Sequence, residues 1–301
     1  MMLVTMLGPR LTDQPCTFCI GSFDGVHRGH QHLLSTAKGL GKNKCCNLDE
    51  RDCRDVADRD DSIACSGRGA ICDRSVIAAR SNCSSYFCPV PKAHSGHTLL
   101  AVLTFSNTPR SLLNKSSHRL ITTPHHKNRL LESLGVDILI DIPFTQELSQ
   151  LSPEAFIALI EKTVPIARWV VGEDFRFGYQ RAGTLQFLQE YATKVHQEVF
   201  VVEKIEDGGD VISSTRIREM IQEGDIQKAS ILLGRPYSIF TKVHGGVLDV
   251  TGLCLPPEGI WAVTVIANDT SYDGRLSIMK EGCFLTASHG QTQETVEVVL
   301  K

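Results

Sequence analysis

The feature that most constrains the fold is an alternation of short apolar runs with amphipathic stretches between residues 16 and 205. The apolar runs are nearly continuous, as expected of strands that are buried on both faces. The stretches between them repeat apolar residues at helical spacing. This alternation predicts an α/β fold in which a parallel sheet is covered by helices on both faces. Five strands are expected, at residues 16–20, 99–105, 136–142, 167–172 and 198–205.

The alternation stops near residue 235. Turn residues and strand-like pieces such as "GIWAVTVIA" and "TVEVVL" follow, in only about 65 residues. Because no helices separate these pieces, we expect a small, incomplete β domain. The sequence therefore predicts two domains, at residues 1–234 and 235–301.

One segment fits neither pattern. Residues 41–97 contain only 8 Leu, Ile, Val or Phe among 57 residues, and they hold seven of the 11 cysteines of the chain. This small amount of apolar surface cannot form a core. We therefore expect a Cys-rich insertion that is disordered or poorly packed. No C-x-x-C pair occurs in it, which argues against a zinc site. Cys16 and Cys19 do form such a pair, but strand geometry directs them to opposite faces of the sheet.

Composition excludes some classes of protein. Lys and Arg number 31 and Asp and Glu 34, so the net charge of -3 argues against a large nucleic-acid surface. The sequence shows no secretory leader and no apolar run as long as a membrane span. We therefore expect a cytoplasmic protein without a nucleic-acid or membrane partner. The oligomeric state is left open.

Chemistry-bearing residues gather in "IGSFDGVHRGHQHLL", which joins the first strand to the first helix. In open α/β sheets, ligands bind at the carboxyl ends of the strands, and this is where His27 and His30 are expected. Two imidazoles at a helix N-terminus can donate hydrogen bonds to a phosphate. The alternative is that His27 is a turn residue and His30 a polar residue of the helix start. The spacing H-x-x-H alone does not decide between them.

A second group of polar residues lies in "ISSTRIR". Ser213, Ser214 and Thr215 precede an amphipathic helix, so their hydroxyls and the free N–H groups of its first turn can bind phosphate oxygens. Arg218 lies about one turn further and can reach the same anion. Taken alone, this is also an ordinary capping pattern.

Several motifs, in order, resemble those of the bacterial FAD synthetases, the bifunctional riboflavin kinase/FMN adenylyltransferase family. They are "GSFDGVHRGHQHLL", "LTFSNTPR", "LGVDILIDIPFTQELSQLSPEAF", "WVVGEDFRFGYQRAGT", "ISSTRIREMIQEGDIQKASILLGRPYSI" and "VHGG". The resemblance covers residues 16–40 and 98 to about 246. It implies a Rossmann-like nucleotidyltransferase domain that transfers AMP from ATP to FMN, giving FAD and pyrophosphate, with Mg²⁺ accompanying ATP.

The resemblance also implies roles for individual residues. The expected catalytic residues are His27, His30, Ser214, Thr215 and Arg218. The expected ATP-binding residues are Gly21, Phe23, Asp24, Gly29 and Ser213. The expected flavin-binding residues are Phe105, Asp174, Phe175 and Arg176. We also expect at least one of Phe175 and Phe177 to anchor in the core.

The chain departs from the family pattern at three places, one of which is Val211, where relatives commonly have a basic residue. Relatives typically read "TFDPHP" where this chain has "TFSNTP", so Ser106 replaces an acidic residue and Thr108 a histidine. In the β domain, Glu297 matches the family's kinase base, but the "GFPTAN"-type segment that holds ATP and magnesium is missing between Gly246 and Leu255. We therefore expect riboflavin kinase activity to be lost.

Two further interpretations remain open. One is a nucleotidyltransferase of the same fold that acts on another phosphorylated acceptor. The other is a catalytically weak protein that binds flavin and nucleotide.

Overall fold

The computed structural model describes residues 2–5, 7–42, 98–106, 119–268, 270–287 and 295–301. The predicted insertion at residues 41–97 lies outside these ranges except for its first two residues, which end α1. Thr108 lies outside them as well.

The first part of the chain forms a parallel sheet, as predicted. Six described strands are ordered β1-β4-β3-β2-β5-β6, and each neighbouring pair is parallel. The strands are β1 (Leu3–Thr5), β2 (Cys16–Ile20), β3 (Leu99–Phe105), β4 (Ile138–Ile142), β5 (Ile166–Gly172) and β6 (Glu198–Val202). The five strands expected from the sequence are present. The short edge strand β1 is an addition that the sequence pattern did not indicate.

The helices of this part are α1 (Arg28–Lys42), α4 (Pro124–Ser133), α5 (Gln146–Ser149), α6 (Pro153–Thr163), α7 (Leu185–Lys194), α8 (Ser214–Glu223) and α9 (Ile226–Leu233), with a 3₁₀ turn η1 (Tyr179–Arg181). A two-stranded hairpin, β7 (Glu206–Asp207) and β8 (Asp210–Val211), precedes α8. Ser152 caps α6, and Pro153 opens it.

The two faces of the sheet carry separate apolar clusters, because successive strand residues point in opposite directions. One cluster joins the strands to Leu34 of α1 and Leu131 of α4. The other joins them to Phe156 of α6 and Leu188 of α7. Cys16 and Cys19 are buried free thiols in different clusters, so they do indeed face opposite sides of the sheet.

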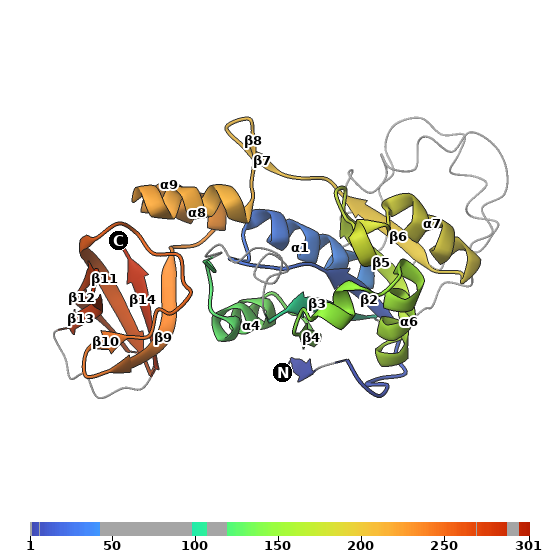
Figure 1. Ribbon diagram of the computed structural model, residues 1–301, viewed down its shortest axis with the longest axis horizontal. Coiled ribbons are helices and arrows are strands. Elements are labelled where there is room, and N and C mark those ends of the chain that lie inside the picture. Colours follow the sequence, from blue (N-terminus) through green and yellow to red (C-terminus); the bar gives the residue numbers. More distant parts are fainter. Residues whose placement is uncertain (1, 6, 43–97, 107–118, 269, 288–294) are drawn as a thin grey trace, which may run out of the picture. The chain divides into compact units, whose positions relative to one another are not determined.

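The last part of the chain forms a closed antiparallel barrel in the order β10-β13-β12-β11-β14-β9. Its strands are β9 (Ser238–His244), β10 (Val247–Leu248), β11 (Gly259–Ala267), β12 (Thr270–Met279), β13 (Gly282–Ala287) and β14 (Thr295–Leu300) (Figure 1). The small β domain is as predicted, although we expected it to be incomplete and its described strands close fully. Pairing of β14 with β9 completes the circle.

Helices α8 and α9 share their core with this barrel. A single apolar cluster contains Ile217 of α8, Leu232 of α9, and Val263 and Val298 of the barrel. None of the described helices combines the length and the apolar character needed to cross a membrane.

Candidate active site at the first strand end

The loop between β2 and α1 is held in a rarely used backbone conformation. Phe23 and Val26 have φ values of 48° and 41°, in the left-handed region that side chains disfavour. Gly25, with φ 79°, packs so closely on Ile121 that a Cβ atom there would lie 3.0 Å from its Cδ1. Such conformations persist only where the surroundings enforce them, and they concentrate at functional sites.

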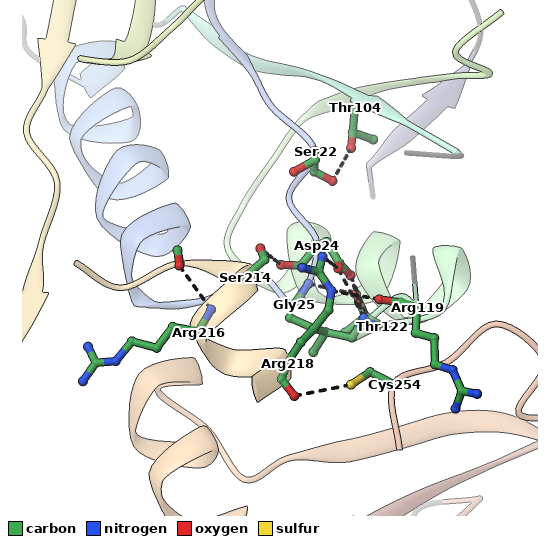
Figure 2. A network of polar contacts seen from close by, with 12 residues as sticks. Ser22, Asp24, Gly25, Thr104, Arg119, Thr122, Ser214, Arg216, Arg218 and Cys254 are labelled. Carbon is green, nitrogen blue, oxygen red and sulfur yellow. Dashed lines mark hydrogen bonds and ion pairs between the residues drawn. The ribbon is translucent and has the colours of Figure 1, made fainter. Parts of the chain in front are cut away.

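The enforcing group is the buried carboxylate of Asp24. Its Oδ1 accepts hydrogen bonds from the backbone N–H groups of Ile121 (3.0 Å) and Thr122 (3.3 Å). Its Oδ2 forms an ion pair with Arg218 of α8 at 2.7 Å. Both side chains are almost fully buried, at 5% and 12% exposure. Asp24 therefore ties the loop to the start of α4 and to α8 (Figure 2).

The N-terminus of α8 meets the same loop. Ser214 Oγ donates to the carbonyl oxygen of Asp24 at 2.9 Å (Figure 2). Ser213 is the N-cap of α8, and its hydroxyl accepts the N–H of Arg216 at 3.3 Å, as the capping interpretation predicts. Thr215 is exposed in the first turn. The structure thus brings "GSFDGVHRGH" and "ISSTRIR", nearly 200 residues apart in sequence, into direct contact.

His27 and His30 stack on each other, with ring centroids 3.7 Å apart and planes inclined by 19°. His27 Nδ1 accepts the backbone N–H of His30 at 3.4 Å, so it caps α1 and leaves Nε2 as the protonated donor. Gly29 permits this packing, because a Cβ there would lie 3.1 Å from the His27 ring. His27 therefore serves the helix start and can still bind a ligand.

The surroundings keep both imidazoles neutral. Burial and, to a smaller extent, the nearby cations Arg235 and Arg218 lower the pKa of His27 to about 4. Burial, with the neighbouring His27, also holds the pKa of His30 well below its usual value. Among the described residues, His30 Nδ1 is a buried ring atom without a hydrogen-bond partner. A buried polar atom without a hydrogen-bond partner is a candidate for a hydrogen bond to a ligand.

The residues predicted for the flavin side are more dispersed. Phe175 stacks on Phe177 (5.2 Å, 18°), and Phe177 is buried in the core, which meets the expectation that one of the two anchors there. Asp174 is exposed and paired with Lys204, whose hydrogen bond lowers the pKa of Asp174. Arg176 is exposed.

Phe105 lies beside the loop between β2 and α1. It lines a cavity whose walls are Ser22, Asp24, Phe105, Ser106, Leu120, Thr122, Pro124 and Lys127. Phe105 also contacts Phe144 edge to face, with centroids 5.4 Å apart. Ser106, at the departure from the family pattern, donates to Asp141 Oδ1 at 2.9 Å.

Sequence reasoning missed two cations of this region. Lys127 is buried on α4, and its spacing of four residues before the buried Leu131 indicates the inner face of the helix, so the pattern contained a signal. Arg235 follows α9 and donates to the carbonyl oxygen of Val26 at 3.3 Å. Nothing in its local sequence marks that contact. No group of three or more His, Cys, Asp or Glu placed to hold a metal ion occurs within the described ranges.

The chain is similar to known proteins over most of its length. A family model described as FAD synthetase matches residues 10–48 and 90–216. A bifunctional riboflavin kinase/FMN adenylyltransferase of Listeria monocytogenes is 32% identical over 282 residues, covering 89% of this chain and 73% of that protein. One of Buchnera aphidicola is 30% identical over 230 residues, covering 75% of this chain and 57% of that protein.

A protein of Listeria monocytogenes named FAD synthetase is 27% identical over 260 residues, covering 85% of this chain and 83% of that protein. Among solved structures, one titled macrolide-efflux protein from Streptococcus pneumoniae has a TM-score of 0.72 and 23% identity. It covers all of this chain and 90% of that chain, and it supports the fold alone.

Proposed function

We propose that this chain, which belongs to the FAD synthetase family, transfers the AMP group of ATP to the phosphate of FMN. The products are FAD and pyrophosphate. One phosphate oxygen of FMN forms a bond to the α-phosphorus of ATP as the bond from that phosphorus to the bridging oxygen breaks. This chemistry needs positioning and charge stabilisation, and it needs no covalent intermediate on the protein.

The observation that carries the proposal is that Asp24 holds the loop between β2 and α1 against the N-terminal part of α8. In the proposed complex, ATP lies between these elements. His27 Nε2 and His30 are neutral donors to phosphate oxygens, and they stabilise the charge that develops on the leaving pyrophosphate. The free N–H groups of the first turn of α8, together with Thr215, bind the same anion.

The role proposed for Arg218 differs from the direct phosphate contact that its spacing suggested. Its guanidinium is bound to Asp24 and to the carbonyl oxygen of Arg119. It therefore positions the loop and α8, and its charge acts on phosphate over a longer distance. ATP enters as its magnesium complex, in which phosphate oxygens are suitable ligands for Mg²⁺. The proposed location is the cytoplasm.

We also propose that riboflavin kinase activity is absent. Glu297, the residue at the position of the kinase base, accepts a hydrogen bond from Ser238 Oγ at 2.7 Å. His126 Nε2 of α4 lies 3.7 Å from the same carboxylate. These contacts, with the missing segment after Gly246, support a structural role for Glu297.

A product assay tests both proposals. Purified protein is incubated with MgATP and either FMN or riboflavin, and flavins are separated by chromatography. We expect FAD from FMN and no product from riboflavin. His27→Ala should lower the rate on the order of 100-fold, the usual effect of removing one transition-state donor. His32→Ala is the matched control, because His32 is an exposed histidine of α1, the helix that follows His27. Unchanged turnover in His27→Ala would refute the assigned role.

A further inference from the structure

Lys127 is a buried lysine whose position no part of the proposed mechanism explains. Only 5% of its surface is exposed. Its Nζ donates to Thr104 Oγ1 at 3.0 Å and to the carbonyl oxygen of Phe105 at 2.8 Å. Thr104 donates in turn to the carbonyl oxygen of Ser22 at 3.0 Å. The ammonium group is therefore fixed at the carboxyl end of β3, beside the loop that carries the two histidines.

Lys127 forms part of a cavity wall. Ser22, Phe105, Ser106 and Thr122 line the same cavity as Lys127. An ammonium has three N–H donors, and the described residues account for two of them. The third is available to a ligand in the cavity.

The charges around the cavity suit an anion. Asp24 also lines it, but its carboxylate is neutralised by Arg218 and accepts two backbone N–H groups. Asp141, the other carboxylate that acts on Lys127, accepts the hydroxyl of Ser106. A neutral side chain could join two strand ends without the unfavourable burial of a charge. The positive charge itself therefore calls for an explanation.

We propose that Lys127 binds the phosphate group of FMN and places its attacking oxygen towards ATP. This inference rests on the proposed adenylyltransferase function. Phe105 supports FMN over ATP as the source of the phosphate. Phe105 lines the cavity, its carbonyl group accepts a hydrogen bond from Lys127, and an aromatic ring is a suitable surface for the flavin. The histidine pair and the α8 N-terminus serve ATP from another part of the loop.

The test compares the binding of FMN and riboflavin, which differ by the phosphate alone. Flavin fluorescence is titrated with wild type and with Lys127→Met and Lys127→Gln, without ATP. We expect each variant to weaken FMN binding at least on the order of 10-fold, the usual effect of one lost charged hydrogen bond. Riboflavin affinity should stay within about two-fold, because no phosphate is involved.

Lys38→Met is the matched control, because Lys38 also donates to a backbone carbonyl, that of Leu134 at 3.2 Å, and does not line the cavity. It should leave both affinities unchanged. Equal losses for FMN and riboflavin in the Lys127 variants would show a structural role and overturn the proposal. An unchanged FMN affinity in the Lys127 variants would show that Lys127 does not bind the FMN phosphate and would also overturn the proposal. Failure of wild type to make FAD would instead contradict the proposed function.

Discussion

At the scale of single residues, the protonation state of the histidine pair governs what it can do. His27 Nδ1 is an acceptor for the α1 backbone, and burial lowers the pKa of His27 to about 4. At neutral pH its ring is therefore an uncharged donor through Nε2. A fixed neutral donor stabilises developing charge without any proton leaving it.

This assignment can be measured on the unliganded protein. The ring resonances of His27 are followed by NMR during an acid titration, with His27→Gln used to identify them. We expect the ring to stay neutral from pH 8 to about pH 5 and to titrate near 4. A midpoint near 6.5, the value of an unperturbed histidine, would contradict a buried neutral donor.

At the same scale, the burial of Lys127 could be predicted from the sequence, whereas the ion-pair partner of Asp24 could not. Lys127 stands four residues before Leu131, so helical periodicity places it on the inner face of α4. Its unusual burial could therefore have been inferred. The partner of Asp24 could not, because Arg218 lies 194 residues away and only the folded chain brings the two charges together.

At the scale of elements, the Asp24–Arg218 pair joins the loop between β2 and α1 to α8. Both side chains are almost fully buried, so removal of one partner leaves the other charge poorly compensated. Breaking such a buried pair typically costs about 3–5 kcal/mol of the free energy of unfolding.

We therefore predict that Asp24→Asn lowers the free energy of unfolding by about 3 kcal/mol. The double variant Asp24→Asn/Arg218→Met should recover part of the loss, because no unpaired charge remains. Urea denaturation of the single and double variants measures both effects. Asp13→Asn is the control, since its pair with Arg10 is largely exposed and should contribute little. The single variants are Asp24→Asn and Arg218→Met. A loss in the double variant equal to the sum of the two single losses would show that the pair is not coupled.

The elements themselves were largely predictable. Strands β2 to β5 are largely buried between helices on both faces, and their near-continuous apolar runs indicate this directly. The edge strand β6 was also predicted, although its side chains are only partly buried. The strand β1 was not, because three residues with a half-exposed Leu3 carry too little pattern. The closure of the barrel depends on the pairing of β9 with β14, more than 50 residues later, and hydrophobic periodicity does not specify partners.

At the scale of the whole molecule, buried neutral histidines link stability to pH. Burial and the cations Arg235 and Arg129 lower the pKa of His126 to about 3, and the pKa of His27 is about 4. Unfolding returns each ring to an ordinary pKa near 6.5. Between the folded and unfolded values the unfolded chain binds more protons, so stability rises with pH in this window and falls as the solution is acidified below 6.5.

We expect His126→Gln to reduce this acid sensitivity. In wild type, each such histidine should remove up to about 1.4 kcal/mol of the free energy of unfolding for each pH unit below 6.5. Urea denaturation at pH 7.5 and pH 5.0 gives the difference for wild type and variant. The same difference in both proteins would show that His126 is charged in the folded state. Ser133→Ala, which alters an exposed position on the same helix, is the control.

The central claim is that the chain transfers the α-phosphoryl group of ATP, with its adenosine, to FMN. The most direct test follows isotopic label from ATP through the purified protein, with FMN and riboflavin in separate reactions. We predict that label on the α-phosphorus appears in FAD and that label on the γ-phosphorus appears in pyrophosphate, in equal amounts. Absence of α-label from FAD, or transfer of γ-label to riboflavin, would contradict the account.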